Sequence, residues 1–81
     1  MFESIVVPDK PQTLVSSTSV IGYSYDDKAY QLVVWYKGKK PSVYRYLMVL
    51  PPVVSSIFDS GGSIGLKLRD AVKGLPHMKL R

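Results

Sequence analysis

Two alternating apolar segments, separated by a short basic loop, dominate the middle of this chain. Tyr30 to Lys37 and Ser42 to Val49 both show the period of two that is typical of β-strands. Gly38 to Pro41 lies between them and contains two lysines, and its glycine and proline favour a turn. The pattern predicts a β-hairpin with cations at its tip and aromatic residues along both strands.

A further strand is predicted before the hairpin and two helices after it. Val20 to Tyr25 has strand composition, and Asp26 to Ala29 is expected to turn because aspartate side chains accept hydrogen bonds from their own backbone. Two prolines after Leu50 stop the third strand and suit the first turn of a helix, which Asp59 to Gly62 would end. A second helix is predicted after Ser63, its N-cap, with an apolar stripe of Ile64, Leu68, Ala71, Val72 and Leu75.

The predicted fold class is α+β, with a three-stranded antiparallel β-meander followed by two helices packed on one face (β-β-β-α-α). The 81 residues make one domain. Residues 1–16 are expected to form an N-terminal arm or an added edge strand, because two prolines break their β-branched run. Residues 17–76 form the domain, and residues 77–81 form a basic C-terminal tail that holds the single histidine, His77.

No group of residues indicates catalysis, a metal or a cofactor. The absence of cysteine excludes disulfides and thiolate ligands, and His77 has no second histidine with which to bind a metal. The serines match no nucleophile motif. Asp26 and Asp27 are neighbours and would point to opposite faces of an extended segment. We therefore expect a protein that is not an enzyme.

The N-terminal residues predict a cytoplasmic protein with no membrane partner. Met1 to Ser4 lacks the basic start of a signal peptide, and Ile5 to Val7 is far shorter than a membrane span.

The formal charge of +5 is concentrated in two parts of the chain. Residues 28–46 contain five cations and no acid, residues 47–81 have a net charge of +3, and residues 1–27 have a net charge of −3. This asymmetry favours an anionic partner, most often a nucleic acid. The alternative is a charge that serves solubility alone.

The two faces of the hairpin are expected to differ. Tyr30, Leu32, Val34 and Tyr36 share the more apolar face of their strand, which should lie under the helices. If Tyr36 lies opposite Tyr44, then Tyr44, Tyr46 and Met48 join this buried face, and the open face consists of Val33, Trp35, Arg45 and Leu47. A slip of one residue would invert every assignment. The alternatives for Trp35 are a core position under the N-terminal arm or the seam of a homodimer.

An open face of this kind suits RNA or single-stranded nucleic acid, because an aromatic ring stacks on bases while cations neutralise phosphates. Arg69 and Lys73 are four residues apart, away from the apolar stripe of the second helix, and would extend the basic track or simply be solvated. Amides at the start of that helix, with Lys67, would hold a phosphate or form an ordinary cap. The predicted binding residues are Trp35, Lys37, Lys39, Lys40, Arg45, Lys67, Arg69 and Lys73.

An ordered set of residues resembles the KTSC domain, a short module found at the C-terminus of some lysyl-tRNA synthetases and as stand-alone bacterial or phage proteins. The matching residues are Ser17-Thr18, Tyr25-Asp26, Leu32, Val34, Tyr36, Val43 to Tyr46 with the hallmark Tyr-x-Tyr, Val49 to Pro51, Ser63-x-Gly65, Leu68, Val72-Lys73 and Pro76. The chain departs from the family at Ser24, usually glycine, at Leu68-Arg69, usually an aromatic residue and asparagine, and in a turn about two residues longer at 38–42.

The family has no established activity, and the resemblance implies an RNA-binding role, which has been suggested for the family. A stand-alone protein of this length also resembles what a phage or prophage encodes. The alternative function is therefore a protein-interaction module that binds or inhibits a host protein through the same hairpin or its edge strand, with Trp35 as the anchor. A purely structural homodimer is a further alternative.

Overall fold

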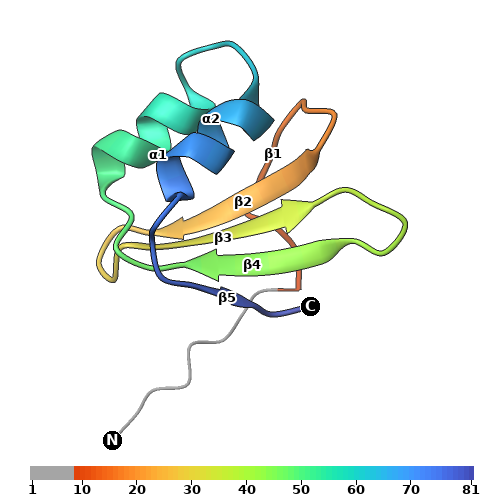
Figure 1. Cartoon of the computed structure of the whole chain (residues 1–81), viewed down its shortest axis with the longest axis horizontal. Helices are drawn as coiled ribbons and strands as arrows, with labels where there is room; N and C mark the ends of the chain where they lie inside the picture. Colours follow the sequence, from red (N-terminus) through yellow and green to blue (C-terminus); the bar gives the residue numbers. More distant parts are fainter. Residues whose placement is uncertain (1–8) are drawn as a thin grey trace, which may run out of the picture.

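The computed structural model describes residues 9–81, and in this part of the chain one antiparallel sheet carries two helices on one face (Figure 1). The strands follow one another across the sheet in chain order. The elements are β1 (Thr13–Leu14), β2 (Val20–Asp26), β3 (Gln31–Tyr36), β4 (Ser42–Tyr46), α1 (Pro51–Phe58), α2 (Ile64–Val72) and β5 (His77–Lys79). The α+β class with an antiparallel sheet and two helices is confirmed, but the sheet has five strands where three were predicted.

Two short strands account for the difference, one at each edge of the sheet. β1 pairs with β2 and lies in the segment predicted to be an arm or an edge strand, of which residues 1–8 are outside the described residues. β5 pairs with β4 and places His77 opposite Tyr46. The prediction of a loose C-terminal tail is therefore wrong. Leu80 anchors this segment by packing on the sheet, and its amide donates to the Val43 carbonyl at 2.7 Å.

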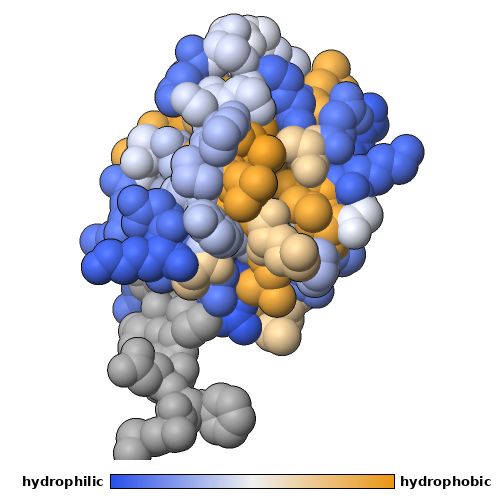
Figure 2. Space-filling view, turned by 90° about the vertical axis from the view of Figure 1, so that its left-hand side faces the viewer, coloured by the Kyte–Doolittle hydropathy of each residue, from blue (hydrophilic) through white to orange (hydrophobic). Residues whose placement is uncertain are grey.

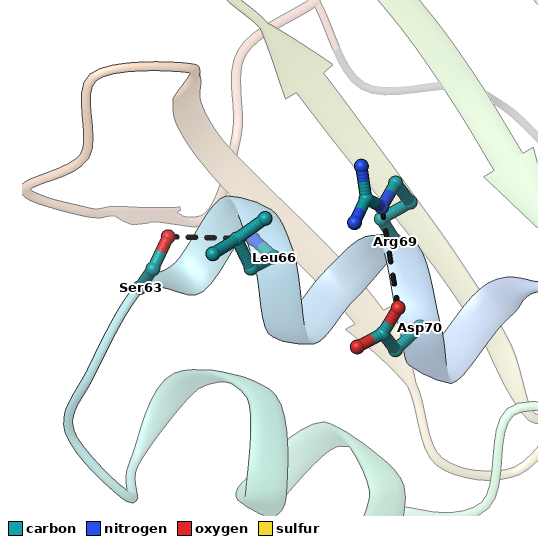
Figure 3. A network of polar contacts seen from close by, with 4 residues as sticks. All are labelled: Ser63, Leu66, Arg69 and Asp70. Atoms are coloured by element: carbon teal, nitrogen blue, oxygen red, sulfur yellow. Dashed lines mark hydrogen bonds and ion pairs between the residues drawn. The ribbon is translucent and has the colours of Figure 1, made fainter.

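Local signals set the turns and helix starts as the sequence predicted. Asp26 Oδ1 accepts hydrogen bonds from the amides of Lys28 and Ala29, at 2.9 and 3.2 Å. α1 starts with proline, and the Ser63 hydroxyl accepts from the Leu66 amide at the start of α2 (Figure 3). The main core lies between these helices and the sheet. Its fully buried side chains are Val20, Leu32, Val34, Val49, Ile57 and Leu68.

The register between β3 and β4 differs by two residues from the prediction. Val34, not Tyr36, lies opposite Tyr44, and Tyr36 lies opposite Ser42. Val43 lies opposite Trp35 and is buried with it. A shift of two preserves the faces, so Tyr44 and Tyr46 still lie on the helix side.

The second face of the sheet is closed, which contradicts the predicted open face. Trp35 is only 5% exposed and packs in a small second core with Val33 and Val43. The chain before β1 crosses this face at Gly22, where an added Cβ would lie 2.8 Å from the Pro11 side chain. Arg81 also contacts the segment before β1, because it forms an ion pair with Asp9 at 3.1 Å. Of the alternatives, the core position for Trp35 is correct.

Neither helix in residues 9–81 has the length and apolar content needed to cross a membrane.

Replacing Gly22 by Ala should detach the segment before β1, because its new methyl group would overlap both Pro11 and the Thr13 carbonyl. We expect Gly22→Ala to lower the free energy of unfolding by about 1–3 kcal/mol, the usual cost of overpacking. Urea unfolding followed by the fluorescence of Trp35 measures this loss.

The matched control is Gly38→Ala in the hairpin turn, where the nearest atom to the new methyl group is 3.6 Å away. It should change stability by less than about 0.5 kcal/mol. Equal stability of the two variants would contradict the crossing of the chain at Gly22.

A candidate nucleic-acid interface

The predicted centre of the binding face is not accessible. Trp35 is buried, so it has no free ring face for a base. Within residues 9–81 its indole N–H has no hydrogen-bond acceptor. Arg45 lies opposite Val33, not opposite Trp35. Its guanidinium is half-buried beside Met78, with Nη2 3.5 Å from the sulfur. The stacking role predicted for Trp35 is therefore wrong, and the reason is that residues just before β1 and just after β5 pack on this face.

The hairpin lysines are exposed and lie just after Tyr36, whose ring is half-buried on the helix side. Lys37, Lys39 and Lys40 follow β3, at the end of the sheet opposite to the end of β4 at Tyr46 (Figure 1). Lys37 Nζ donates to the Ser17 carbonyl at 2.5 Å. Tyr36 packs against Tyr44 and shares a hydrogen bond with Tyr46, so the turn itself offers mainly charge.

Lys67 already has partners within the protein. Its ammonium donates to the Ser60 hydroxyl at 3.0 Å and to the Gly61 carbonyl. The Ser63 hydroxyl accepts from a first-turn amide of α2. These contacts describe an ordinary helix cap, which was the alternative to a phosphate site.

Arg69 and Lys73 lie at a groove between α2 and the strands β4 and β5. The groove has a volume of about 460 Å³ and is formed where the chain leaves α2 and returns to the sheet as β5 (Figure 1). Both side chains are exposed. The lining residues are Tyr44, Tyr46, Arg69, Asp70, Val72, Lys73, Gly74 and His77.

Three aromatic rings form one side of this groove. The rings of Tyr44 and Tyr46 are nearly parallel, with centroids 6.3 Å apart. The His77 ring lies 6.3 Å from Tyr44 and 6.0 Å from Tyr46, because β5 places it opposite Tyr46. Tyr46 is buried, whereas Tyr44 is half-buried and His77 is exposed. Tyr44 and His77 therefore present the accessible aromatic surface.

A phenol pair holds the floor of the groove in place. The hydroxyls of Tyr36 and Tyr46 are 2.7 Å apart and share a hydrogen bond. Burial, followed by this hydrogen bond, raises the pKa of Tyr36 well above its ordinary value, and burial also raises the pKa of Tyr46. Both phenols are neutral near neutral pH, so their shared hydrogen bond is retained there. This bond holds the ring of Tyr46 in position beside the ring of Tyr44.

The charges at this groove are mostly positive. Lys79 lies opposite Tyr44 in the register and shares its face, adding to the cations of Arg69 and Lys73. Asp70 is the one acid among the lining residues. Stacking surfaces beside cations suit a base and its phosphates.

Sequence reasoning missed four of these residues. Tyr44 and Tyr46 were predicted to be structural, which describes the buried Tyr46 but not the accessible Tyr44. Asp70 and His77 carried no predicted role. The Tyr-x-Tyr motif was the available signal, because alternation along a strand places its two aromatic side chains on the same face, where they offer a surface for stacking.

A second surface is apolar and lies at the end of the sheet that holds the β2–β3 turn and the loop before α1. Met48 is 68% exposed, Leu50 is 50% exposed and Tyr30 is 44% exposed. The predicted burial of Tyr30 and Met48 is therefore wrong, because both lie beyond the ends of the paired strands, where alternation no longer sets the face. Tyr30 and Met48 both have positive φ, and the Val49 amide joins the two loops by donating to the Tyr30 carbonyl. Figure 2 shows hydrophobic side chains gathered down the middle of this end of the molecule.

No protein-family model matches the chain, and no curated protein matches it. Within residues 9–81, no group of three or more His, Cys, Asp or Glu side chains has the arrangement needed to hold a metal ion.

The buried phenol pair predicts a loss of stability at high pH. In the unfolded chain Tyr36 ionises near pH 10.0, whereas the folded protein holds this proton to higher pH. The contribution of the protonated Tyr36 to the free energy of unfolding is complete below pH 10.0. It is lost as the pH rises above this value, because only the unfolded state then gains from ionisation. Between about pH 8 and about pH 11, the free energy of unfolding measured in urea should fall less for Tyr36→Phe than for the wild type.

The same variant should be less stable than the wild type by about 1 kcal/mol at the lower pH, because it loses the shared hydrogen bond. An equal fall with pH in both proteins would contradict this assignment.

Proposed function

We propose that this chain is a non-enzymatic, KTSC-like module that binds RNA or single-stranded nucleic acid through the groove between α2 and β4–β5. The observation that carries the proposal is the meeting of an accessible aromatic pair, Tyr44 and His77, with the cations Arg69 and Lys73 in one groove. The role suggested for the KTSC family and the net charge of +5 agree with it.

The groove offers aromatic rings to the base of a nucleotide and cations to its phosphates. A base stacks on Tyr44 or His77, which contributes about 1–3 kcal/mol for each stacked base. Arg69 on α2 and Lys73, which follows α2 directly, are both exposed and reach the phosphates on either side of that base. Few contacts of this kind give weak binding that depends strongly on salt, because each neutralised phosphate releases counterions.

A protein-interaction module is the second candidate function, and the apolar surface around Met48 favours it. A residue held at positive φ costs about 1–3 kcal/mol unless it is glycine, and such strain gathers at functional sites. Tyr30 and Met48 carry this cost while exposing apolar side chains. A protein partner, including a host protein of a phage, would gain from burying them.

Removing the two groove cations should weaken binding of a labelled single-stranded RNA. At low salt we expect Arg69→Ala combined with Lys73→Ala to lose at least about tenfold in affinity. In a plot of the logarithm of affinity against the logarithm of salt concentration, the slope should become shallower by about 1.4. This is the change expected when two phosphate contacts to a single strand are lost. Fluorescence anisotropy across a salt series measures both effects.

The matched control removes the same charge from the hairpin tip, as Lys39→Ala combined with Lys40→Ala. It should retain most of the affinity and the wild-type slope, because these lysines lie at the other end of the sheet. Equal weakening by the two double variants would show that binding follows net charge or the hairpin tip instead of the groove.

The second candidate predicts that Met48 serves a partner and not the fold. Met48→Gly should keep or raise stability by up to about 1 kcal/mol, because glycine accepts positive φ without strain. In nuclease-treated lysate, a partner captured by the wild type and by the groove double variant should be lost with Met48→Gly. Capture that survives this change would contradict a role for the apolar surface.

A further inference from the structure

Asp70 is the feature of the groove that phosphate binding does not explain. It lines the same groove as Tyr44, Arg69 and Lys73, and it is the one carboxylate there. A surface that only neutralised phosphates would lose affinity through a negative charge at this place, because like charges repel. A carboxylate in a cationic, aromatic groove is instead suited to the edge of a base.

The carboxylate is free to accept hydrogen bonds from a ligand. Its side chain is 76% exposed, and its nearest cation is Arg69, with 4.0 Å between Oδ1 and Nε (Figure 3). That separation is longer than a hydrogen bond. Both carboxylate oxygens therefore keep acceptor capacity on the groove side of α2.

The number and arrangement of donors differ among the four bases. The Watson–Crick edge of guanine carries two adjacent donors, N1–H and the N2 amine, which match the two oxygens of one carboxylate. Adenine and cytosine carry a single amine beside an acceptor nitrogen. Uracil places its N3–H between two carbonyls, which a carboxylate repels. Unpaired bases in RNA are commonly recognised on this edge while they stack on aromatic side chains.

We propose that Asp70 reads the base held in this groove and gives the module a preference for unpaired guanine. The inference rests on the proposed nucleic-acid binding, and it adds a specificity that stacking and charge do not supply. Arg69 stands next to Asp70 and donates to a neighbouring phosphate or to the guanine O6, so the two side chains divide the recognition of one nucleotide.

The test compares short oligouridylates that carry one central guanine, adenine, cytosine or uracil. The wild type should bind the guanine oligonucleotide about tenfold more tightly than the all-uracil one, a typical discrimination for a two-point contact to a base edge. Asp70→Asn keeps the size of the side chain but replaces one acceptor by a donor, so the preference should fall to within about twofold. The control Asp27→Asn makes the same change of charge in the β2–β3 turn and should keep the wild-type preference.

The possible failures are distinguishable. If Asp70→Asn raises affinity equally for all four oligonucleotides, or leaves all of them unchanged, the carboxylate does not read the base and the inference is wrong, while the proposed function stands. If the wild type binds none of them more tightly than the Arg69→Ala, Lys73→Ala variant does, both the proposed function and the guanine preference are overturned.

Discussion

The burial of β3 on both faces is the constraint on which the rest of this structure depends. Leu32 and Val34 lie against the helices, while Val33 and Trp35 lie on the opposite side. The two helices of this protein are short, and they cover only one face of the sheet (Figure 1). Among the described residues, the second face is covered instead by the segment at Pro11 and by Leu80.

Closure of that face moves the accessible aromatic surface to the other side of the sheet. The helices bury Tyr46, but α2 ends before it covers the edge formed by β4 and β5. Tyr44 stays half-buried there, and β5 adds His77 beside it. The same strand that completes the sheet therefore also completes the candidate site, together with the cations of α2.

The predictions that hold rest on short-range interactions, and those that fail rest on distant ones. The Asp26 turn and the Ser63 cap each join groups no more than three residues apart, so the pattern of residues was sufficient. The faces of Tyr44 and Tyr46 were also predicted correctly, because alternation survives a register error of two residues. Trp35 was assigned to the wrong environment because nothing near it in the chain reveals what covers it.

By itself, the sequence determined the central strands, the two helices, their apolar stripes and the excess of positive charge. These follow from periodicity, capping and composition, which act over a few residues. Tertiary structure alone decided that Trp35 is buried, that residues 77–79 form a strand and that Arg69 and Tyr44 line one groove. Such outcomes depend on contacts between residues remote along the chain, of which the Asp9–Arg81 pair spans 72 positions, and the local pattern does not rank one distant partner above another.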